Sequence, residues 1–400
     1  MRAIFKTMKR KIIHLDLDAF FCSVEELLDP SLKGKVFAVG GSPTGRGVIT
    51  SASYAARLLG VRSAMPTREA LNLVPNLILV RSGFRHYSEY SDKVMEILRD
   101  TTPVVEQVSV DEAFLDVSDM PQPISSIACD LQKRVLNETG LPCSLGCATS
   151  KLVAKIANDY GKKQVKSGLS PQKVTVIEEG KEAEFLAPLD IQALWGVGPK
   201  TATHLRQRGI NTIGRLAALS DADLKNYFGM HGVSMRRRAQ GIDASPVHPD
   251  SGEPKSVSNE VTFHEDQDEE VSLLYRLRGL SEKVGARLRK ADLAGSVVQI
   301  KIRYSDFSTF TRQASLKECT NLDQDIFDTA QDLFLKHWVR DRPVRLLGVG
   351  VTNLDKPHRQ LGLFDNDGAK REELTKAVDD LRERFGKDII KRADTLKKKN

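Results

Sequence analysis

Three carboxylates, drawn from two separated stretches of the sequence, are the side chains best suited to do chemistry. Asp111 and Glu112 are adjacent, and Asp16 lies far upstream in an apolar segment. Acids in an apolar frame repel each other and lose solvation, which is costly unless a cation neutralises them. A set made only of carboxylates suits a hard, oxygen-seeking ion such as Mg²⁺ rather than zinc. The sequence therefore predicts that these acids hold a Mg²⁺ pair for phosphoryl transfer; the alternative is a surface hairpin with solvated acids.

Two β-strands are expected to position these acids. Residues 12–18 alternate apolar and polar side chains, which is typical of a half-buried strand. The stretch Ser109-Val110-Asp111-Glu112 separates two apolar runs, at 104–108 and 113–117, and so should form the tip of a β-hairpin. Neighbours in a regular strand point to opposite faces. Both acids of the tip would therefore meet one cation only where the strand bends.

The pair Asp16 and Asp18 also admits a second interpretation. An Asp-x-Asp sequence after an apolar strand is typical of phosphatases in which the first Asp is the nucleophile. Such an enzyme would leave the acids at 111 and 112 without a function.

Several separated motifs follow one another along the chain. They are Asp16-Leu17-Asp18-Ala19-Phe20-Phe21, then Ser53-Tyr54-Ala55-Ala56-Arg57 with Gly60-Val61-Arg62, and then Ser109-Val110-Asp111-Glu112. Together they resemble the Y-family DNA polymerases, and the bacterial members most closely, from about residue 10 to residue 364. Ser53 departs from the pattern, because the family usually has Asn at this position.

The resemblance implies a role for each residue of the carboxylate site. Asp16 and Asp111 would bridge two Mg²⁺ ions, and Glu112 would complete the site beneath the primer 3′-hydroxyl. The backbone carbonyl of Leu17 would be a further metal ligand. One ion would lower the pKa of the 3′-hydroxyl, and the other would neutralise charge on the triphosphate and the leaving pyrophosphate.

Other residues match positions at which this family binds the incoming nucleotide. Phe21 matches the steric gate, a bulky ring that leaves no room for the 2′-hydroxyl of a ribonucleotide. Tyr54 and Arg57, three residues apart on an expected helix, would hold the β- and γ-phosphates. Lys155 would reach the triphosphate, whereas Lys151 is left open between that role and a solvated helix start.

The pattern of expected elements indicates an α+β multidomain chain, and the resemblance implies a right-hand polymerase. Its parts would be a ferredoxin-like palm, small helical fingers, a helical thumb and a βαββαβ little finger. The expected boundaries are residues 1–20 and 83–176 for the catalytic palm, 21–82 for the fingers, 177–242 for the thumb, 243–258 for a linker, 259–356 for the little finger, and 357–400 for a clamp-binding peptide and C-terminal tail.

The thumb segment contains a candidate for duplex binding. Residues 194–202 fit a helix-hairpin-helix, in which Gly196 and Gly198 make the tight hairpin. Free N–H groups at the start of the next helix would bind a backbone phosphate, and Lys200 would add charge. The arginine run at 236–238 is interpreted as a solvated face. In the little finger, Lys301, Arg303 and Arg312 are candidates to neutralise phosphates.

A short peptide near the C-terminus resembles the segment with which bacterial polymerases bind the sliding clamp. Gln360 would form hydrogen bonds, and Leu361, Leu363 and Phe364 would fill an apolar pocket. Beyond it, apolar residues recur at helical spacing between 374 and 389. They predict a helix that packs on the body or on a partner.

The composition is compatible with this interpretation. A chain of 400 residues predicts two to four domains, and its formal charge of +7 permits a polyanionic partner. Five cysteines without paired spacing predict reduced thiols in the cytoplasm rather than a zinc site. Neither a signal peptide nor a membrane-spanning segment is expected. The expected partners of a monomeric protein are primer-template DNA, deoxynucleoside triphosphates and the sliding clamp.

The sequence thus predicts a template-directed, error-prone translesion DNA polymerase without proofreading. Two alternatives remain beside it: the Asp-nucleophile phosphatase, and a non-catalytic DNA-binding protein tethered to the clamp. The carboxylates argue against the second alternative, because a protein that only binds DNA gains nothing from acids that face it.

Overall fold

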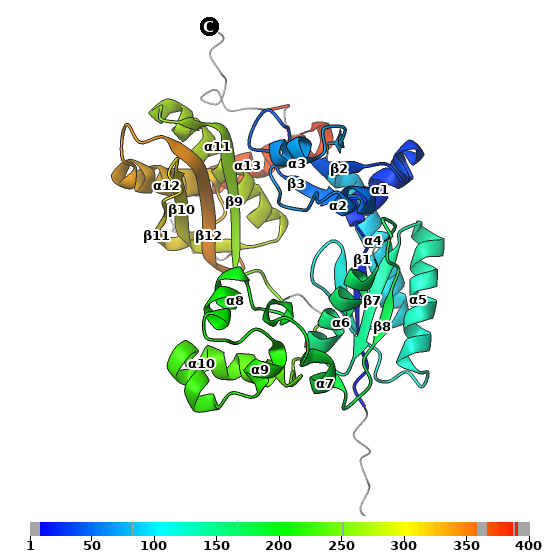
Figure 1. The fold of residues 1–400 in the computed structure, drawn as a ribbon. Helices are drawn as coiled ribbons and strands as arrows, with labels where there is room; N and C mark the ends of the chain where they lie inside the picture. The colour runs from blue at the N-terminus through cyan, green and yellow to red at the C-terminus, as the bar shows by residue number, and fades with distance from the viewer. Residues whose placement is uncertain are drawn as a thin grey trace, which may run out of the picture. The chain divides into compact units, whose positions relative to one another are not determined.

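The chain forms two compact units, residues 1–251 and residues 252–400 (Figure 1). The structure is a computed structural model that describes residues 9–81, 83–165, 167–249, 252–357, 366–386 and 389–390. Among these residues, no helix combines the length and the apolar character needed to cross a membrane.

A five-stranded sheet lies at the centre of the first unit. Its order is β5-β6-β1-β7-β8, and all neighbours are antiparallel except β7 and β8. The strands are β1 (Ile12–Leu17), β5 (Val105–Gln107), β6 (Glu112–Asp116), β7 (Cys143–Ala148) and β8 (Val174–Val176). The expected hairpin around Ser109 is confirmed, since β5 and β6 pair directly across it. The strand β8 was not expected from the sequence.

The two faces of this sheet pack against different helices, as the alternation in β1 requires. Ile13, Leu15 and Leu17 are buried in one core with α4 (Phe84–Thr101) and α5 (Ile124–Thr139). The opposite face is covered by α6 (Lys151–Gln164), which lies across the sheet from α5 (Figure 1). Gly146 on β7 allows this contact, because an added Cβ would lie only 1.9 Å from the carbonyl oxygen of Ala154.

The segment between β1 and α4 contains strands as well as helices. Three short strands form a separate sheet in the order β3-β2-β4. The elements are α1 (Phe20–Leu28), β2 (Phe37–Gly40), β3 (Ile49–Ala52), α2 (Tyr54–Leu58), α3 (Thr67–Leu73) and β4 (Ile78–Val80). The segment expected to form small helical fingers therefore also contains strands. These strands are only three or four residues long, too short to show an alternating pattern.

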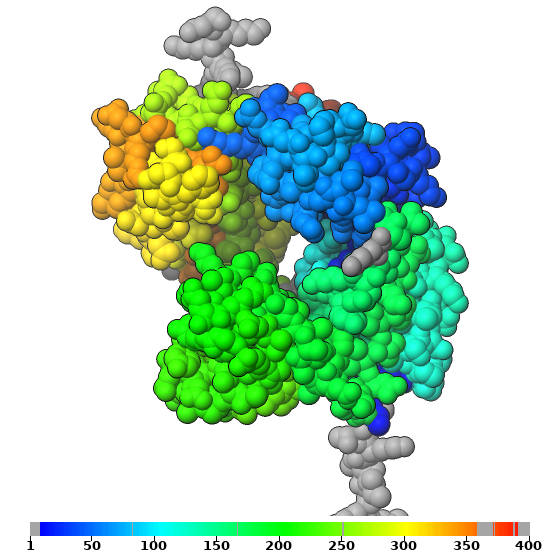
Figure 2. All heavy atoms as spheres, viewed as in Figure 1, coloured from blue at the N-terminus to red at the C-terminus, as the bar shows by residue number. Residues whose placement is uncertain are grey.

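The remainder of the first unit is helical. It contains α7 (Glu182–Leu186), a 3₁₀ turn at Ile191–Ala193, α8 (Pro199–Arg206), α9 (Ile213–Ala217) and α10 (Asp221–Ala239). Backbone hydrogen bonds connect these pieces, for example from the N–H of Gly214 to the carbonyl of Ala187 at 3.0 Å. Apolar residues of α6 share one core with them. In Figure 2 the atoms of α8–α10 form a continuous green surface.

The chain after α10 is fixed to the first unit over residues 243–248. The Asp243 carboxylate accepts a hydrogen bond from the backbone N–H of Leu152 at 3.0 Å, at the start of α6. Val247 is buried in the core shared with α6, and the N–H of His248 donates to Glu106 at 2.9 Å. The structure therefore differs from a free tether over these residues.

The second unit is a four-stranded antiparallel sheet with two long helices on one face. The strand order is β11-β10-β12-β9. Along the chain the elements are β9 (Ser256–Gln267), α11 (Glu270–Lys290), β10 (Ala294–Tyr304), β11 (Thr309–Thr320), α12 (Asp323–His337) and β12 (Val344–Asp355). The βαββαβ order predicted from the sequence is confirmed, since every strand and helix appears in its expected place.

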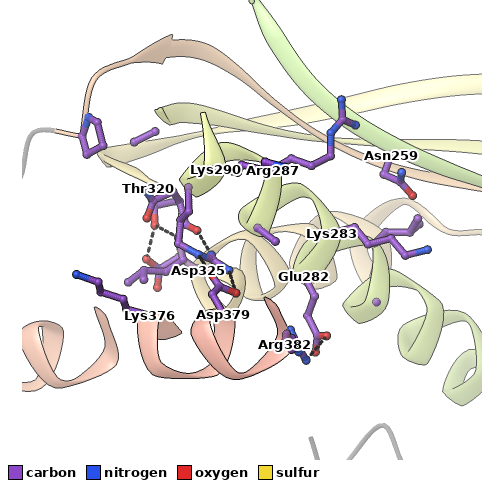
Figure 3. A pocket seen from close by; sticks show the side chains of 18 of the residues that line it. Asn259, Glu282, Lys283, Arg287, Lys290, Thr320, Asp325, Lys376, Asp379 and Arg382 are labelled. Atoms are coloured by element: carbon purple, nitrogen blue, oxygen red, sulfur yellow. Dashed lines mark hydrogen bonds and ion pairs between the residues drawn. The ribbon is translucent and has the colours of Figure 1, made fainter. Parts of the chain in front are cut away.

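The last described helix, α13 (Asn366–Phe385), borders a groove that α11 and β11 also line (Figure 3). Its contacts are ionic: Arg289 on α11 binds Asp379 at 2.6 Å, and Arg382 binds Glu282 at 3.3 Å. Leu374 and Phe385 are each 66% exposed. The tail helix predicted from the sequence is present, but charged residues rather than its apolar stripe attach it to the body.

Candidate active site

The three predicted carboxylates meet at one end of the five-stranded sheet. Asp16 on β1 is the direct register partner of Glu112 on β6. The next backbone position pairs differently, because the N–H of Leu17 donates to the carbonyl of Asp111 at 2.9 Å. Asp111 lies just before β6 begins, where the strand bends into the hairpin turn. The structure thus brings together acids that are almost a hundred residues apart in sequence.

The turn that carries Asp111 is held by its own serine. The Ser109 hydroxyl donates to the Asp111 carboxylate at 2.6 Å and accepts from the N–H of Glu112 at 3.0 Å. On α4, Ser91 donates to the carbonyl of Val110 at 2.6 Å. These bonds fix the backbone from both sides, so the two adjacent acids leave the chain at a defined bend.

Two lysines of α6 pair with the acids of the sheet. Lys162 lies 2.5 Å from Asp16 and 3.1 Å from Asp18, and Lys155 lies 3.0 Å from Glu112. As the side chains stand, no three His, Cys, Asp or Glu residues of the described ranges are arranged to hold a metal ion. In their place, two lysine ammonium groups contact the acids. The acids offer only oxygen donors, and such a donor set suits a hard divalent cation. Lys162 was not predicted from the sequence.

The surroundings raise the pKa of Asp16 and lower the pKa of Glu112. Burial raises the pKa of Asp16 to about 7, although Lys162 opposes this shift. The His14 imidazole and then the Lys155 ammonium hold the pKa of Glu112 at about 2, despite partial burial. Burial alone would lower the pKa of Lys162, but Asp16 and Asp18 outweigh it and raise the pKa. Lys162 therefore stays charged between the two acids, 2.5 Å from Asp16.

A buried histidine lies beside Glu112. The amide nitrogen of Asn158 donates to the carbonyls of His14 and Ser144 at 3.2 and 3.0 Å, which fixes the amide orientation. The same nitrogen lies 3.0 Å from Nδ1 of His14, so Nδ1 is the acceptor and Nε2 carries the proton. Burial lowers the pKa of His14, which favours this neutral form. Nε2 lies 3.8 Å from Glu112, which is longer than a hydrogen bond, but the N–H dipole still points at the carboxylate and favours its ionised form.

Asp18 is completely buried, and its hydrogen bonds join separate parts of the backbone. Its carboxylate accepts from the hydroxyls of Ser144 and Ser170 and from the backbone N–H of Gln172, all at about 3 Å or less. These bonds connect β1 with β7 and the chain before β8. The phosphatase interpretation finds no support here, because the second Asp of the pair is enclosed rather than open to a substrate.

Tyr54 and Arg57 lie together on α2, as their spacing predicted. The Arg57 guanidinium is 4.6 Å from the centre of the Tyr54 ring, and its Nε–H donates to the carbonyl of Ala52 at 2.9 Å. The Ser53 side chain caps the helix by accepting from the N–H of Ala56. Burial raises the pKa of Tyr54, with Asp18 the next largest influence, and Lys162 acts in the opposite direction. Tyr54 therefore lies within electrostatic range of the carboxylate site.

The helix-hairpin-helix candidate has the expected local geometry. Gly196 has a φ of +93°, a conformation that favours glycine, and Gly198 is the N-cap of α8. Lys200 is exposed in the first turn of α8. Arg238, which was interpreted as solvated, instead donates to the carbonyl of Trp195, and Arg236 pairs with Asp221.

Several other sequence predictions concern basic or apolar residues outside this centre. Lys151 is not a solvated helix start, because it is buried and binds Glu106 at 2.6 Å. In the second unit, Lys301 pairs with Glu260 and Arg303 donates to Thr309, both at 2.8 Å. The clamp-peptide residues Gln360, Leu361, Leu363 and Phe364 lie outside the described residues.

Comparisons with known proteins find matches over nearly the whole chain. Residues 15–159 match the impB/mucB/samB family, residues 254–363 match its C-terminal domain, and residues 179–210 match the HHH motif of this family. A protein of Dehalococcoides mccartyi named DNA polymerase IV is 41% identical over 98% of this chain and 99% of its own length. One of Bacillus subtilis named DNA polymerase IV 1 is 37% identical over 97% of this chain and 94% of its own length.

Solved structures show the same fold. A Y-family DNA polymerase chimera built from Dbh and Dpo4 is 24% identical, with a TM-score of 0.76 over 87% of this chain and all of the chimera. DinB from Sulfolobus solfataricus is 25% identical, with a TM-score of 0.59 over the same shares. The expectation of an α+β right-hand fold is confirmed. The chain belongs to the impB/mucB/samB family, that is, to the Y-family of DNA-directed DNA polymerases.

Proposed function

We propose that the protein is an error-prone translesion polymerase that extends a primer on a DNA template with deoxynucleoside triphosphates. The observation that carries this proposal is the convergence of Asp16, Asp111 and Glu112 at one sheet end. At that end, two lysines face more acids than they can neutralise. Carboxylates in such excess hold divalent cations, which phosphoryl transfer requires.

Each residue of the sheet end has a separate task in this proposal. Asp16, Asp111, Glu112 and the carbonyl of Leu17 would hold two Mg²⁺ ions. When bound, these ions would lower the pKa of the primer 3′-hydroxyl and neutralise charge on the triphosphate. The bend at Asp111, which Ser109 and Ser91 fix, directs the acids to the same end of the sheet.

The triphosphate is expected to lie on the side of Tyr54 and Arg57. The Arg57 guanidinium rests on the Tyr54 ring, so its remaining N–H groups are held in one plane for phosphate oxygens. Lys162 interacts electrostatically with Tyr54, and we add it to the predicted Lys155 as a phosphate-facing cation. In this role each lysine would exchange an acidic partner for a phosphate.

Tolerance of damaged templates is proposed from the residues that would cover the new base pair. Val48, Thr50 and Ser51 lie at and next to β3, and all three side chains are small. A small-residue surface leaves space for a distorted template base, which also reduces the penalty for a mispair.

The assay that tests the catalytic proposal is primer extension on a gapped template with Mg²⁺. Asp111→Ala should reduce extension at least ~10³-fold, because it removes a ligand of the ions that would stabilise charge in the transition state. Asp119→Ala, an exposed acid beyond the same hairpin, is the matched control and should extend normally. Equal activity of Asp111→Ala and wild type would contradict the proposed site. A template with a bulky adduct, assayed in parallel, measures bypass directly.

Recruitment by the sliding clamp is the second part of the proposal, and it rests on the sequence of residues 360–364. Deletion of these five residues should abolish the stimulation of synthesis by added clamp and leave extension of a naked primer unchanged. Loss of both activities would show that the peptide is not a separable binding element.

A further inference from the structure

Phe21, the proposed steric gate, is packed against aromatic rings of α1 and α4. Its ring centroid lies 4.4 Å from that of Tyr87, 5.4 Å from that of Phe20 and 6.3 Å from that of Phe84. Tyr87 is only 1% exposed, whereas Phe84 is 66% exposed. The nearest and most deeply buried support of the gate is therefore the Tyr87 ring.

Tyr87 is held at its hydroxyl by two hydrogen bonds. The hydroxyl donates to the Glu25 carboxylate at 2.5 Å and accepts from the backbone N–H of Gly83 at 3.3 Å. A tyrosine hydroxyl has one proton to donate, and here that proton is used. Burial, followed by the hydrogen bond to Glu25, raises the pKa of Tyr87, so the hydroxyl remains a donor. The Tyr87 side chain is thus held by ring packing against Phe21 and by hydrogen bonds at its hydroxyl.

Glu25, which accepts the hydrogen bond from Tyr87, lies on α1, the same helix that carries Phe21. Phe21 and Glu25 are four residues apart on α1, so their side chains lie on neighbouring parts of one helix face. Glu25 is 9% exposed and lies among core residues of α1 and α4. A buried carboxylate is costly in such a place unless a hydrogen bond compensates it. A hydrophobic pair would fill the same space at lower cost, which suggests that the pair fixes an orientation.

We propose that the Glu25–Tyr87 hydrogen bond keeps the Phe21 ring from retreating and thereby sets how strongly the enzyme rejects ribonucleotides. This inference rests on the proposed function and on Phe21 as the gate. A ring excludes a 2′-hydroxyl by repulsion, and the repulsion is strong only when the ring has no room to move. Glu25 and Tyr87 are positioning residues in this scheme, since they act on the sugar only through Phe21.

The test compares kcat/KM for a ribonucleotide and for the matching deoxynucleotide. Tyr87→Phe keeps the ring and removes only the hydroxyl. We expect the ratio of ribonucleotide to deoxynucleotide incorporation to rise on the order of tenfold, the size of effect that loss of one charge-assisted hydrogen bond can have. The deoxynucleotide kcat/KM should change much less. Glu25→Ala should shift the ratio in the same direction, because it removes the acceptor.

Three further variants separate gate positioning from general damage to the fold. Glu25→Gln retains an acceptor oxygen and should restore most of the discrimination. Tyr90→Phe removes a hydroxyl from the same helix, at a ring outside the Phe21 cluster, and should leave the ratio unchanged. In the double variant Phe21→Ala/Tyr87→Phe, the second change should add nothing, because Tyr87 acts only through the gate.

The outcomes distinguish this inference from the function on which it rests. If Phe21→Ala relaxes sugar selection but Tyr87→Phe and Glu25→Ala do not, the inference is wrong and the proposed gate stands. If Phe21→Ala itself has no effect, the gate and the inference both fail. Additive effects in the double variant, or equal losses for both sugars, would show that Tyr87 has a merely structural role. Thermal unfolding of each variant identifies any that fail to fold.

Discussion

Two networks of paired charges in this chain use different cations and have different consequences. At the end of the five-stranded sheet, Lys155 and Lys162 pair with Glu112, Asp16 and Asp18, while Asp111 lies alongside. In the second unit, Arg289 binds Asp323 at 2.8 Å, Asp379 at 2.6 Å and the carbonyl of Asn321 at 2.6 Å. Both networks are largely buried and both contain more acids than cations, but the cations are lysines in the first and an arginine in the second.

The difference lies in how replaceable each cation is. A guanidinium is planar and donates in fixed directions, so Arg289 specifies the positions of Asp323 and Asp379 and joins α11, α12 and α13. An ammonium is a compact point charge on a flexible stem, so another cation can replace it where several acids converge. The arginine network thus fixes one arrangement, whereas the lysine network leaves acids that a divalent cation can neutralise.

The largest effect is expected when the lysine network loses a cation. Lys162→Met should lower the free energy of unfolding by about 3 kcal/mol without divalent cations, because Asp16 and Asp18 are left buried and unneutralised. Mg²⁺ should recover much of this loss, since a ligand that binds only the folded state stabilises it. Thermal unfolding of wild type and variant, each with Mg²⁺ and with a chelator, measures both quantities.

Arg289→Met is the matched control for that experiment. It should also destabilise the protein by about 3 kcal/mol, because Asp323 and Asp379 lose their shared partner. Mg²⁺ should not restore its stability, if the comparison between the two networks holds. Equal recovery of both variants, or recovery of neither, would remove the distinction between a replaceable and a fixed cation.

The lysine network shows how much of the site could be predicted from the sequence. The alternation in β1 and the acidic hairpin tip predicted which strands carry the acids. Lys162 was missed although a signal was present: Lys155, Asn158 and Lys162 follow at i, i+3 and i+7, which is one face of α6. That polar stripe faces the polar side of β1, where Asn158 binds His14 and the two lysines bind acids.

Other parts of the structure left no signal of this kind. Glu25 and Tyr87 are 62 residues apart, and neither has a sequence pattern that identifies the other as its partner. The α13 helix was predicted from its apolar periodicity, but its docking residues, Asp379 and Arg382, lie off that stripe and resembled ordinary surface charges. Long-range pairing of single polar residues depends on the fold as a whole, whereas periodicity reports only local structure.

The smallest effect is expected for an acid held by hydrogen bonds rather than by a dominant cation. Partial burial opposes ionisation of Asp243, but hydrogen bonds from Ser245 and Leu152 outweigh it and keep the pKa below its ordinary 3.8. A lowered folded-state pKa contributes stability above the unfolded value, and this contribution is lost as the pH falls through the folded value. Asp243→Asn should therefore be less stable than wild type at neutral pH, by under about 1 kcal/mol after screening by solvent.

This small difference should shrink as the pH is lowered below about 4, where wild-type Asp243 becomes protonated as well. Urea unfolding of wild type and variant across this range measures it. Ser245→Ala removes the hydrogen bond from the Ser245 hydroxyl to the carboxylate and keeps the one from the Ser245 backbone N–H. The pKa of Asp243 in the folded state should therefore rise toward 3.8, and the pH at which this stability is lost should rise with it. If the difference in free energy of unfolding between wild type and Asp243→Asn did not change with pH, the charge of Asp243 would not contribute to stability.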